Sequence, residues 1–211
     1  AKIDDVRTNM TTLLFTEQLT FDKTFGDHHL AITAVYEQQS TKAYGEQMVG
    51  YQSTNNFQTL FGATNVSAFS TSSENLLISY VGRVNYEFAG KYLLSAAIRR
   101  DGLSVWAPGN KFANFPSASV GWRIDQESFM HNLKNVSELK VRVGWGETGL
   151  NGVGIFGKLP NSQLANDYPW QAVVSQNGAI YPFNNTMPSG GNASFYNAIS
   201  NPDLEWEKTR Q

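Results

Sequence analysis

The sequence of 211 residues contains no cysteine, so it can form neither a disulfide nor a metal site with thiolate ligands. Its formal net charge of −2 gives no electrostatic reason to expect nucleic acid or another polyanion as a partner. No apolar run approaches the roughly 18 residues of a membrane-spanning helix. A membrane β-barrel is compatible with this absence, because its strands give a much weaker hydropathy signal than helices do.

What the sequence does have is a regular alternation of apolar and polar residues, which is clearest between Leu76 and Asp101. Up to Phe88 every second residue is apolar, and the residues between are mostly polar. A short turn at 89–91 contains Gly90, and the alternation then resumes. A period of two is typical of a β-strand, because successive side chains point to opposite faces. The segment is therefore predicted to be an antiparallel hairpin, with arms long enough to cross a bilayer at a tilt, which takes about 9–11 residues.

The same pattern recurs along the chain and predicts about seven strands. They lie near 13–25, 28–37, 76–88, 91–101, 115–124, 138–148 and 204–211. Residues 38–75 are polar and lack any period, so we expect a long loop there, with further loops at 102–114 and 149–203 and a short helical turn at 125–136. Short turns on one side and long loops on the other are typical of membrane barrels. The predicted fold class is all-β: an antiparallel up-and-down transmembrane β-barrel segment, incomplete, with long extracellular loops.

The two rows of each strand predict which side chains face lipid and which face the lumen. The polar rows hold the residues predicted to face the lumen, namely Arg83, Arg99, Arg123 and Arg142. The apolar rows hold those predicted to face lipid, namely Leu19, Phe21, Ile78, Val84, Leu94, Val120 and Val143. Aromatic residues near the short turns suit an interfacial girdle, namely Phe25, Tyr86, Phe88 and Tyr92. A soluble sandwich would show the same alternation, so a soluble all-β carbohydrate-binding module is the alternative interpretation.

Several segments match, in order, the pattern of a known family. They are TFDKTFGDHHL (20–30), GRVNY (82–86), KYLL (91–94), RRDG (99–102), FPSASVGWRI (115–124), LKVRVGWGETG (139–149) and NPDLEWEKTRQ (201–211). Over Tyr80 to Gly149, together with 20–30 and 201–211, which is roughly half of its length, the chain resembles the SusC/RagA family of TonB-dependent outer-membrane transporters. It departs from the family pattern at Leu103 and Val105, where a serine and a basic residue are expected.

The resemblance implies an energised importer in the outer membrane of a Gram-negative bacterium. Family barrels have about 22 strands, so the chain would be a mid-barrel fragment without the plug domain, and the barrel would be multi-pass and surrounded by lipid. The implied substrates are oligosaccharides or other glycans, or peptides. The implied partners are a SusD-like surface lipoprotein and the TonB complex, which acts through the plug.

The long connection 149–203 is the best candidate for ligand binding. Its aromatic residues are Tyr168, Trp170, Tyr181, Phe183, Phe195 and Tyr196, and they lie among many asparagines. Aromatic rings suit the apolar faces of sugars, and carboxamides can both donate to and accept from hydroxyl groups. The alternative is that these rings pack the loop's own small core.

Nothing in the sequence favours catalysis, a metal or a cofactor, so the protein is not expected to be an enzyme. Residues Gly144–Gly149 match G-x-G-x-x-G, but the following LNGVGIFG is a poor helix start, which favours glycines in a strand over a dinucleotide site. The adjacent His28 and His29 would point to opposite faces of a strand and so could not share one metal ion. Acidic residues at 203, 205 and 207 are expected to be solvated.

Overall fold

The computed structural model describes residues 1–52, 59–130, 136–150, 168, 170–179 and 193–211. Within these residues the chain is all-β apart from two short 3-10 turns, η1 (Ile124–Gln126) and η2 (Ser128–Met130). No helix in this described part is long and apolar enough to cross a membrane.

Seven strands form one open antiparallel sheet in the order β1-β2-β3-β4-β5-β6-β9, and β7 pairs with β8 in a separate hairpin. The strands are β1 (Lys2–Phe25), β2 (His28–Tyr51), β3 (Thr64–Phe88), β4 (Tyr92–Leu103), β5 (Phe112–Arg123), β6 (Lys140–Leu150), β7 (Val173–Ala179), β8 (Ala193–Ala198) and β9 (Glu207–Arg210). Each strand from β1 to β5 pairs with the next one along the chain, so β1 to β6 form an up-and-down meander, and β9 then pairs with β6. The predicted all-β antiparallel fold with seven strands is confirmed.

Tight turns set the register of the first two hairpins. Gly26 begins the turn between β1 and β2 at a φ of 60°, in the left-handed region that glycine adopts without steric cost. Ala89 and Gly90, at φ 53° and 70°, form the turn between β3 and β4. The two successive left-handed residues at Ala89 and Gly90 match the right-handed twist of the flanking strands, as does a turn that begins with a left-handed glycine such as Gly26, so these turns fix the register of the two hairpins.

The prediction of a loop over residues 38–75 is wrong. There β2 continues to Tyr51, β3 begins at Thr64, and the two strands pair along nearly their whole length. The apolar row is missing because both faces of this part of the sheet carry polar side chains. Cross-strand polar contacts take its place, such as the hydroxyls of Thr12 and Thr41 at 3.3 Å.

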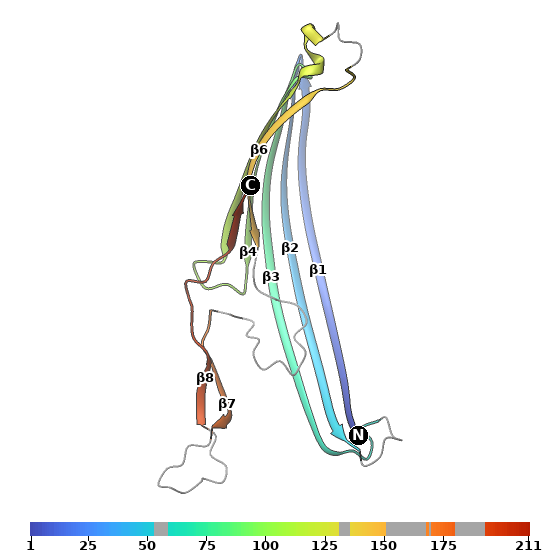
Figure 1. Ribbon diagram of the computed structural model, residues 1–211, viewed down its shortest axis with the longest axis vertical. Helices are drawn as coiled ribbons and strands as arrows, with labels where there is room; N and C mark the ends of the chain where they lie inside the picture. The colour runs from blue at the N-terminus through green and yellow to red at the C-terminus, as the bar shows by residue number, and fades with distance from the viewer. Residues whose placement is uncertain (53–58, 131–135, 151–167, 169, 180–192) are drawn as a thin grey trace.

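Figure 1 shows the consequence of this longer pairing: β1, β2 and β3 extend well beyond β4 and β5 at one end of the bowed sheet. The short turns and the two 3-10 turns gather at the other end. These three strands have 24, 24 and 25 residues, whereas β4 and β5 have 12 each, so three strands project twice as far.

The remaining boundaries need smaller corrections. The loop expected at 102–114 is shorter, because β4 runs to Leu103 and β5 begins at Phe112. The helical turn expected over 125–136 is present as η1 and η2, which start one residue earlier and reach Met130 in the described part. Within 149–203, the β7–β8 hairpin was not foreseen.

Candidate functional site

The two faces of the seven-stranded sheet differ in character, and each is defined by the strand register. We call the face that carries Arg83, Ser95 and Ser119 the polar face. A hollow of about 900 Å³ lies over it, lined from β2 to β6. Its polar lining includes His29, Arg83, Asn85, Glu87, Ser95, Ser117, Ser119, Lys140, Arg142 and Thr148. Small residues keep this face open, because a Cβ on Gly144 would lie only 3.2 Å from the Cβ of Ser119.

All four arginines of the polar rows share this polar face by register, although their environments differ. Arg83 and Arg142 line the hollow, and Arg142 donates to the Ser119 hydroxyl at 2.9 Å. Arg99 lies further from the short turns. It donates through Nε to both carboxylate oxygens of Asp101, at 2.7 and 2.8 Å, and through Nη2 to Ser79. Arg123 lies at the turn end, with Nη2 3.7 Å from Asp125 Oδ2.

The opposite face, which we call the apolar face, carries a continuous band of exposed hydrophobic side chains. One cross-strand row runs from Phe21 on β1 to Trp145 on β6 through Ile32, Val84, Ala96 and Ala118. Large residues of this band are strongly exposed, with Leu19 at 75%, Val143 at 67% and Val120 at 56%. No described segment covers these side chains, which a second packed sheet would have buried.

Two rows of aromatic side chains border the apolar band. At the turn end, the His28 ring lies among Phe25, Tyr86 and Phe88, at centroid distances of 5.6, 6.0 and 4.9 Å. Phe88 also stacks on Tyr92 at 6.3 Å. At the opposite border, Tyr36 contacts Phe15 and Tyr80 at 6.4 and 5.4 Å. The second row was not predicted from the sequence.

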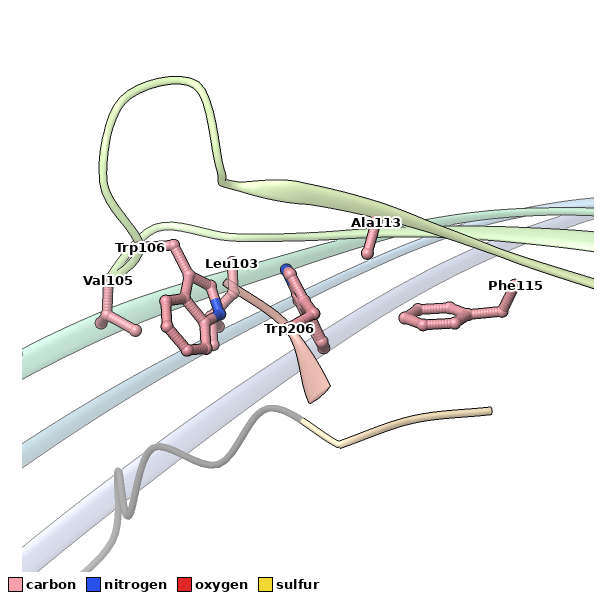
Figure 2. Close-up of a cluster of buried hydrophobic side chains, with 6 residues drawn as sticks. All are labelled: Leu103, Val105, Trp106, Ala113, Phe115 and Trp206. Carbon is pink, nitrogen blue, oxygen red and sulfur yellow. The ribbon is translucent and has the colours of Figure 1, made fainter. Parts of the chain in front are cut away.

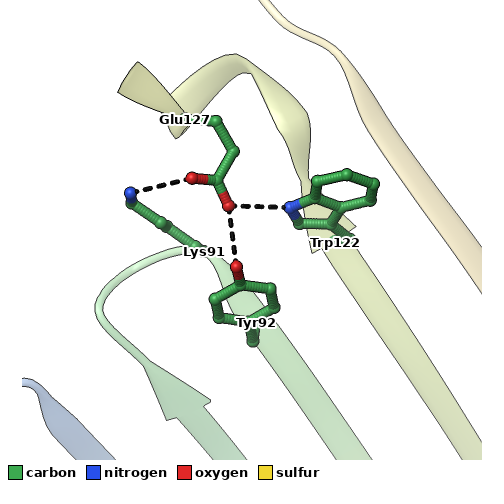
Figure 3. A network of polar contacts seen from close by, with 4 residues as sticks. All are labelled: Lys91, Tyr92, Trp122 and Glu127. Atoms are coloured by element: carbon green, nitrogen blue, oxygen red, sulfur yellow. Dashed lines mark hydrogen bonds and ion pairs between the residues drawn. The ribbon is translucent and has the colours of Figure 1, made fainter. Parts of the chain in front are cut away.

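At the turn end, one carboxylate joins three separate parts of the sheet. Glu127, between η1 and η2, accepts hydrogen bonds from Lys91 Nζ at 3.1 Å, Tyr92 Oη at 2.9 Å and Trp122 Nε1 at 3.0 Å, as Figure 3 shows. The hydrogen bonds from Trp122, Tyr92 and Lys91 hold the pKa of the Glu127 carboxyl below its ordinary value. We call this group the Glu127 clamp. It fixes the β3–β4 turn and the β5–β6 connection to each other.

A compact apolar cluster lies where β4, β5 and the segment before β9 meet, and we call it the Trp206 cluster. It contains Leu103, Val105, Trp106, Ala113, Phe115 and Trp206, all at most 8% exposed. Trp206 lies between Trp106 and Phe115, at centroid distances of 6.2 and 5.8 Å (Figure 2). The departures from the family pattern at Leu103 and Val105 thus have a physical reason, because both side chains are buried here.

Polar contacts tie the segment before β9 to the β4–β5 connection. The Asn110 amide donates to the carbonyls of Pro202 and Leu204, at 3.2 and 3.3 Å, and Trp206 Nε1 donates to the Lys111 carbonyl at 3.1 Å. These contacts hold the segment before β9 at a fixed position against the β4–β5 connection.

Only two of the six aromatic candidates for ligand binding can be placed by side chain. Tyr168 is 39% exposed, and the carbonyl of Trp170 accepts hydrogen bonds from Ser200 Oγ and the Asn201 amide, both at 3.0 Å. These bonds connect Trp170 to residues 200 and 201, in the segment that precedes Trp206. Phe195 and Tyr196 belong to β8, whereas Tyr181 and Phe183 lie outside the described residues.

The motifs that could have indicated a cofactor have structural roles in the described part of the chain. Gly144–Gly149 lies within strand β6, as the strand interpretation predicts. His28 pairs with Tyr86 on the apolar face, while His29 Nε2 lies 3.0 Å from Asp22 Oδ1 on the polar face. No group of three or more metal-ligating side chains occurs among the residues that the structure describes.

Comparison with characterised proteins gives consistent results, although no protein-family model matches the chain. The chain is 36% identical over 138 residues to the TonB-dependent receptor SusC of Bacteroides thetaiotaomicron, covering 65% of this chain and 12% of that protein. It is 31% identical over 208 residues to the TonB-dependent receptor P3 of Formosa agariphila, covering 96% of this chain and 19% of that one. The chain thus spans less than a fifth of the length of these relatives.

Solved structures share the fold. The match to the RagAB peptide transporter covers 99% of this chain and 22% of the transporter's chain, with a TM-score of 0.75 at 18% identity. The match to the RagAB peptide importer in its open-open state covers 98% of this chain and 21% of the importer's chain, with a TM-score of 0.74 at 20% identity. At such identities the likeness shows a common fold. Together with the sequence matches to named receptors, it shows that this chain belongs to the SusC/RagA family of TonB-dependent receptors.

Proposed function

We propose that this chain forms part of the barrel wall of an outer-membrane importer of the SusC type, energised by TonB. The observation that carries the proposal is the opposite character of the two faces of one sheet. Exposed apolar side chains cover one face across six strands, and a polar hollow covers the other. A single sheet with these faces suits a wall between lipid and an aqueous lumen.

The height of the apolar band supports this proposal. Its two aromatic borders lie at Phe15 and Phe25 on β1. At about 3.3 Å per residue, that part of the strand is about 33 Å long. At the usual tilt of about 35–45° it spans about 25 Å along the membrane normal, the height of the apolar band of an outer-membrane barrel.

On this proposal the polar face lines the lumen, with Arg83, Arg99, Arg123 and Arg142 pointing into it. The projecting parts of β1, β2 and β3 then stand outside the bilayer, which explains why both of their faces are polar. On this proposal Tyr168 and Trp170, which belong to the connection after β6, lie on the same extracellular side and can contact an incoming substrate.

We propose that the substrates are oligosaccharides or peptides, delivered with a SusD-like lipoprotein. A strain lacking the complete receptor gene should lose growth on one of these classes and keep growth on the corresponding monosaccharides or amino acids. Normal growth on every oligosaccharide and peptide tested would contradict import. A Trp170→Ala receptor that is present at normal levels in the outer membrane should show weakened uptake, if this ring contacts substrate.

Lipid contact separates this proposal from a soluble binding module, and the lack of cysteine in the chain makes a labelling test clean. Single cysteines would replace Val84 or Asn85 in the full-length receptor, with any other cysteines removed, after reconstitution into liposomes. A photoreactive probe carried by the lipid tails should label position 84 and not position 85, because neighbours on a strand face opposite ways. Equal labelling at both positions would contradict the barrel wall.

A further inference from the structure

The aromatic border at the turn end contains polar groups that the barrel wall itself does not require. His28 lies on the apolar face between the rings of Phe25 and Phe88, at 5.6 and 4.9 Å. Its Nδ1 is 2.6 Å from the hydroxyl of Tyr86. When Tyr86 donates this hydrogen bond, the proton of the ring is on Nε2, which has no partner among the described residues. A half-buried imidazole is thus held with one donor available at the membrane boundary.

Lys23 adds a positive charge beside this imidazole. It pairs directly with Leu30, so His28 is its diagonal neighbour on the same face, with about 7–8 Å expected between such positions. Among the described residues, Lys23 has no ion pair and no hydrogen bond. Two other lysines differ in this respect, because Lys91 is paired with Glu127 and Lys42 with Glu74, both at 3.1 Å.

The nearby acidic groups do not neutralise Lys23 within the described structure. Asp22 and Glu87 belong to the polar rows, and Asp22 is engaged there by His29. Asp27 lies in the turn beyond the end of β1, where its carbonyl accepts the Ala89 amide. A lysine stem along apolar surface with its amine at the boundary suits a ligand that is both apolar and anionic.

We propose that Lys23 and His28, the latter oriented by the hydrogen bond from Tyr86, bind the phosphate of a phospholipid head group, whose acyl chains lie along the apolar face beside Phe21 and Ile32. Lys23 supplies the charge, the imidazole supplies a directional donor, and the neighbouring rings pack against the glycerol and the first methylenes. This inference rests on the proposed membrane setting, in which the short turns mark the periplasmic boundary.

The test uses the full-length receptor purified in a neutral detergent, delipidated, and titrated with short-chain phosphatidylglycerol while bound lipid is counted by native mass spectrometry. Lys23→Gln should weaken binding about fivefold, because one basic residue at a membrane surface contributes about 1 kcal/mol. Lys23→Arg should retain the affinity. Lys42→Gln is the matched control, because this lysine is also on the apolar-face row of its strand but is already paired with Glu74, and it should bind lipid as the wild type does.

Two results would overturn the lipid site. One is equal phosphatidylglycerol binding by the wild type and Lys23→Gln. The other is competition by millimolar inorganic phosphate that is as effective as competition by the lipid, which would indicate a site for free anions. A failure of the membrane setting would show separately, because the wild-type receptor would then be missing from the outer-membrane fraction on a density gradient.

Discussion

At the residue scale, neighbouring positions on β3 should respond in opposite ways to the same change. Val84 lies in the apolar band, and Asn85 lines the hollow on the other face. Val84→Arg should cost about 2–4 kcal/mol of unfolding free energy, because it places a charge near the middle of the bilayer. Asn85→Arg should cost much less, because it points into water. Refolding of the full barrel into vesicles measures both, and equal losses would contradict the assignment of the faces.

The Glu127 clamp predicts a dependence on pH. The folded-state pKa of Glu127 lies below the unfolded-state value, so its carboxylate stabilises the fold above the unfolded pKa, and this contribution is lost as the pH falls through the folded pKa. Glu127→Gln should therefore destabilise the receptor at neutral pH by an amount that shrinks as the medium is acidified below about pH 4.3.

Thermal melts of wild type and Glu127→Gln at a series of pH values check this expectation. Ser128→Ala is a suitable control, because its side chain is exposed beside Glu127 and bonds to no carboxylate in the described structure. A stability difference that grew toward acid pH would show that Glu127 is protonated in the folded state.

At the scale of elements, alternation in the sequence was informative wherever one face of a strand is apolar. It predicted the end of β3, the turn after it and both ends of β4 to within two residues, and it assigned each side chain of the apolar band to one row. It failed over 38–51 and 64–75, because both faces of the sheet carry polar side chains there and no apolar row can be detected.

The Trp206 cluster was missed for a different reason. Its members come from three separate segments, and no local period connects them. Two signals were present: Phe115 is a large apolar side chain at the start of a row of serines and glycine, and Leu103 and Val105 are apolar where the family resemblance predicted a serine and a basic residue. The Glu127 clamp could not be predicted, since it depends on a turn that brings Lys91 close to Glu127.

Loss of the Trp206 side chain should release β9 from the sheet. This strand pairs with β6 through four residues only, so packing next to it must hold it in place. Trp206 is 8% exposed, and truncating such a residue costs about 3–5 kcal/mol. Trp206→Ala should therefore speed amide exchange in residues 207–210 of the full receptor by tenfold or more.

The control for this experiment is Trp145→Ala. Trp145 belongs to β6 as well, but it is 49% exposed on the apolar face. Its loss should leave exchange in β9 unchanged. Similar acceleration in both variants would mean that β9 is held by the sheet as a whole.

At the scale of the whole molecule, the open sheet predicts how residues 1–211 behave when produced alone. Strands β1 and β9 lie at the two edges, and each pairs on one side only in the described sheet. Unpaired backbone groups in hydrocarbon cost several kcal/mol each, and the apolar face needs lipid or detergent. We therefore expect aggregation in buffer and no stable insertion into vesicles. A monodisperse, detergent-free monomer with a cooperative melt would support the soluble module instead.

The strand order also determines the order of folding events. From β1 to β6, consecutive strands pair with each other, so pairing can spread from hairpin to hairpin with small losses of loop entropy. Joining β9 to β6 is different, because the chain between Leu150 and Glu207 must first close on itself. Relative to a two-residue turn, closing so long a segment costs about 3 kcal/mol more. Burial of Trp206 directly before β9 offsets that cost, so this indole holds β9 at β6 once the connecting segment has closed.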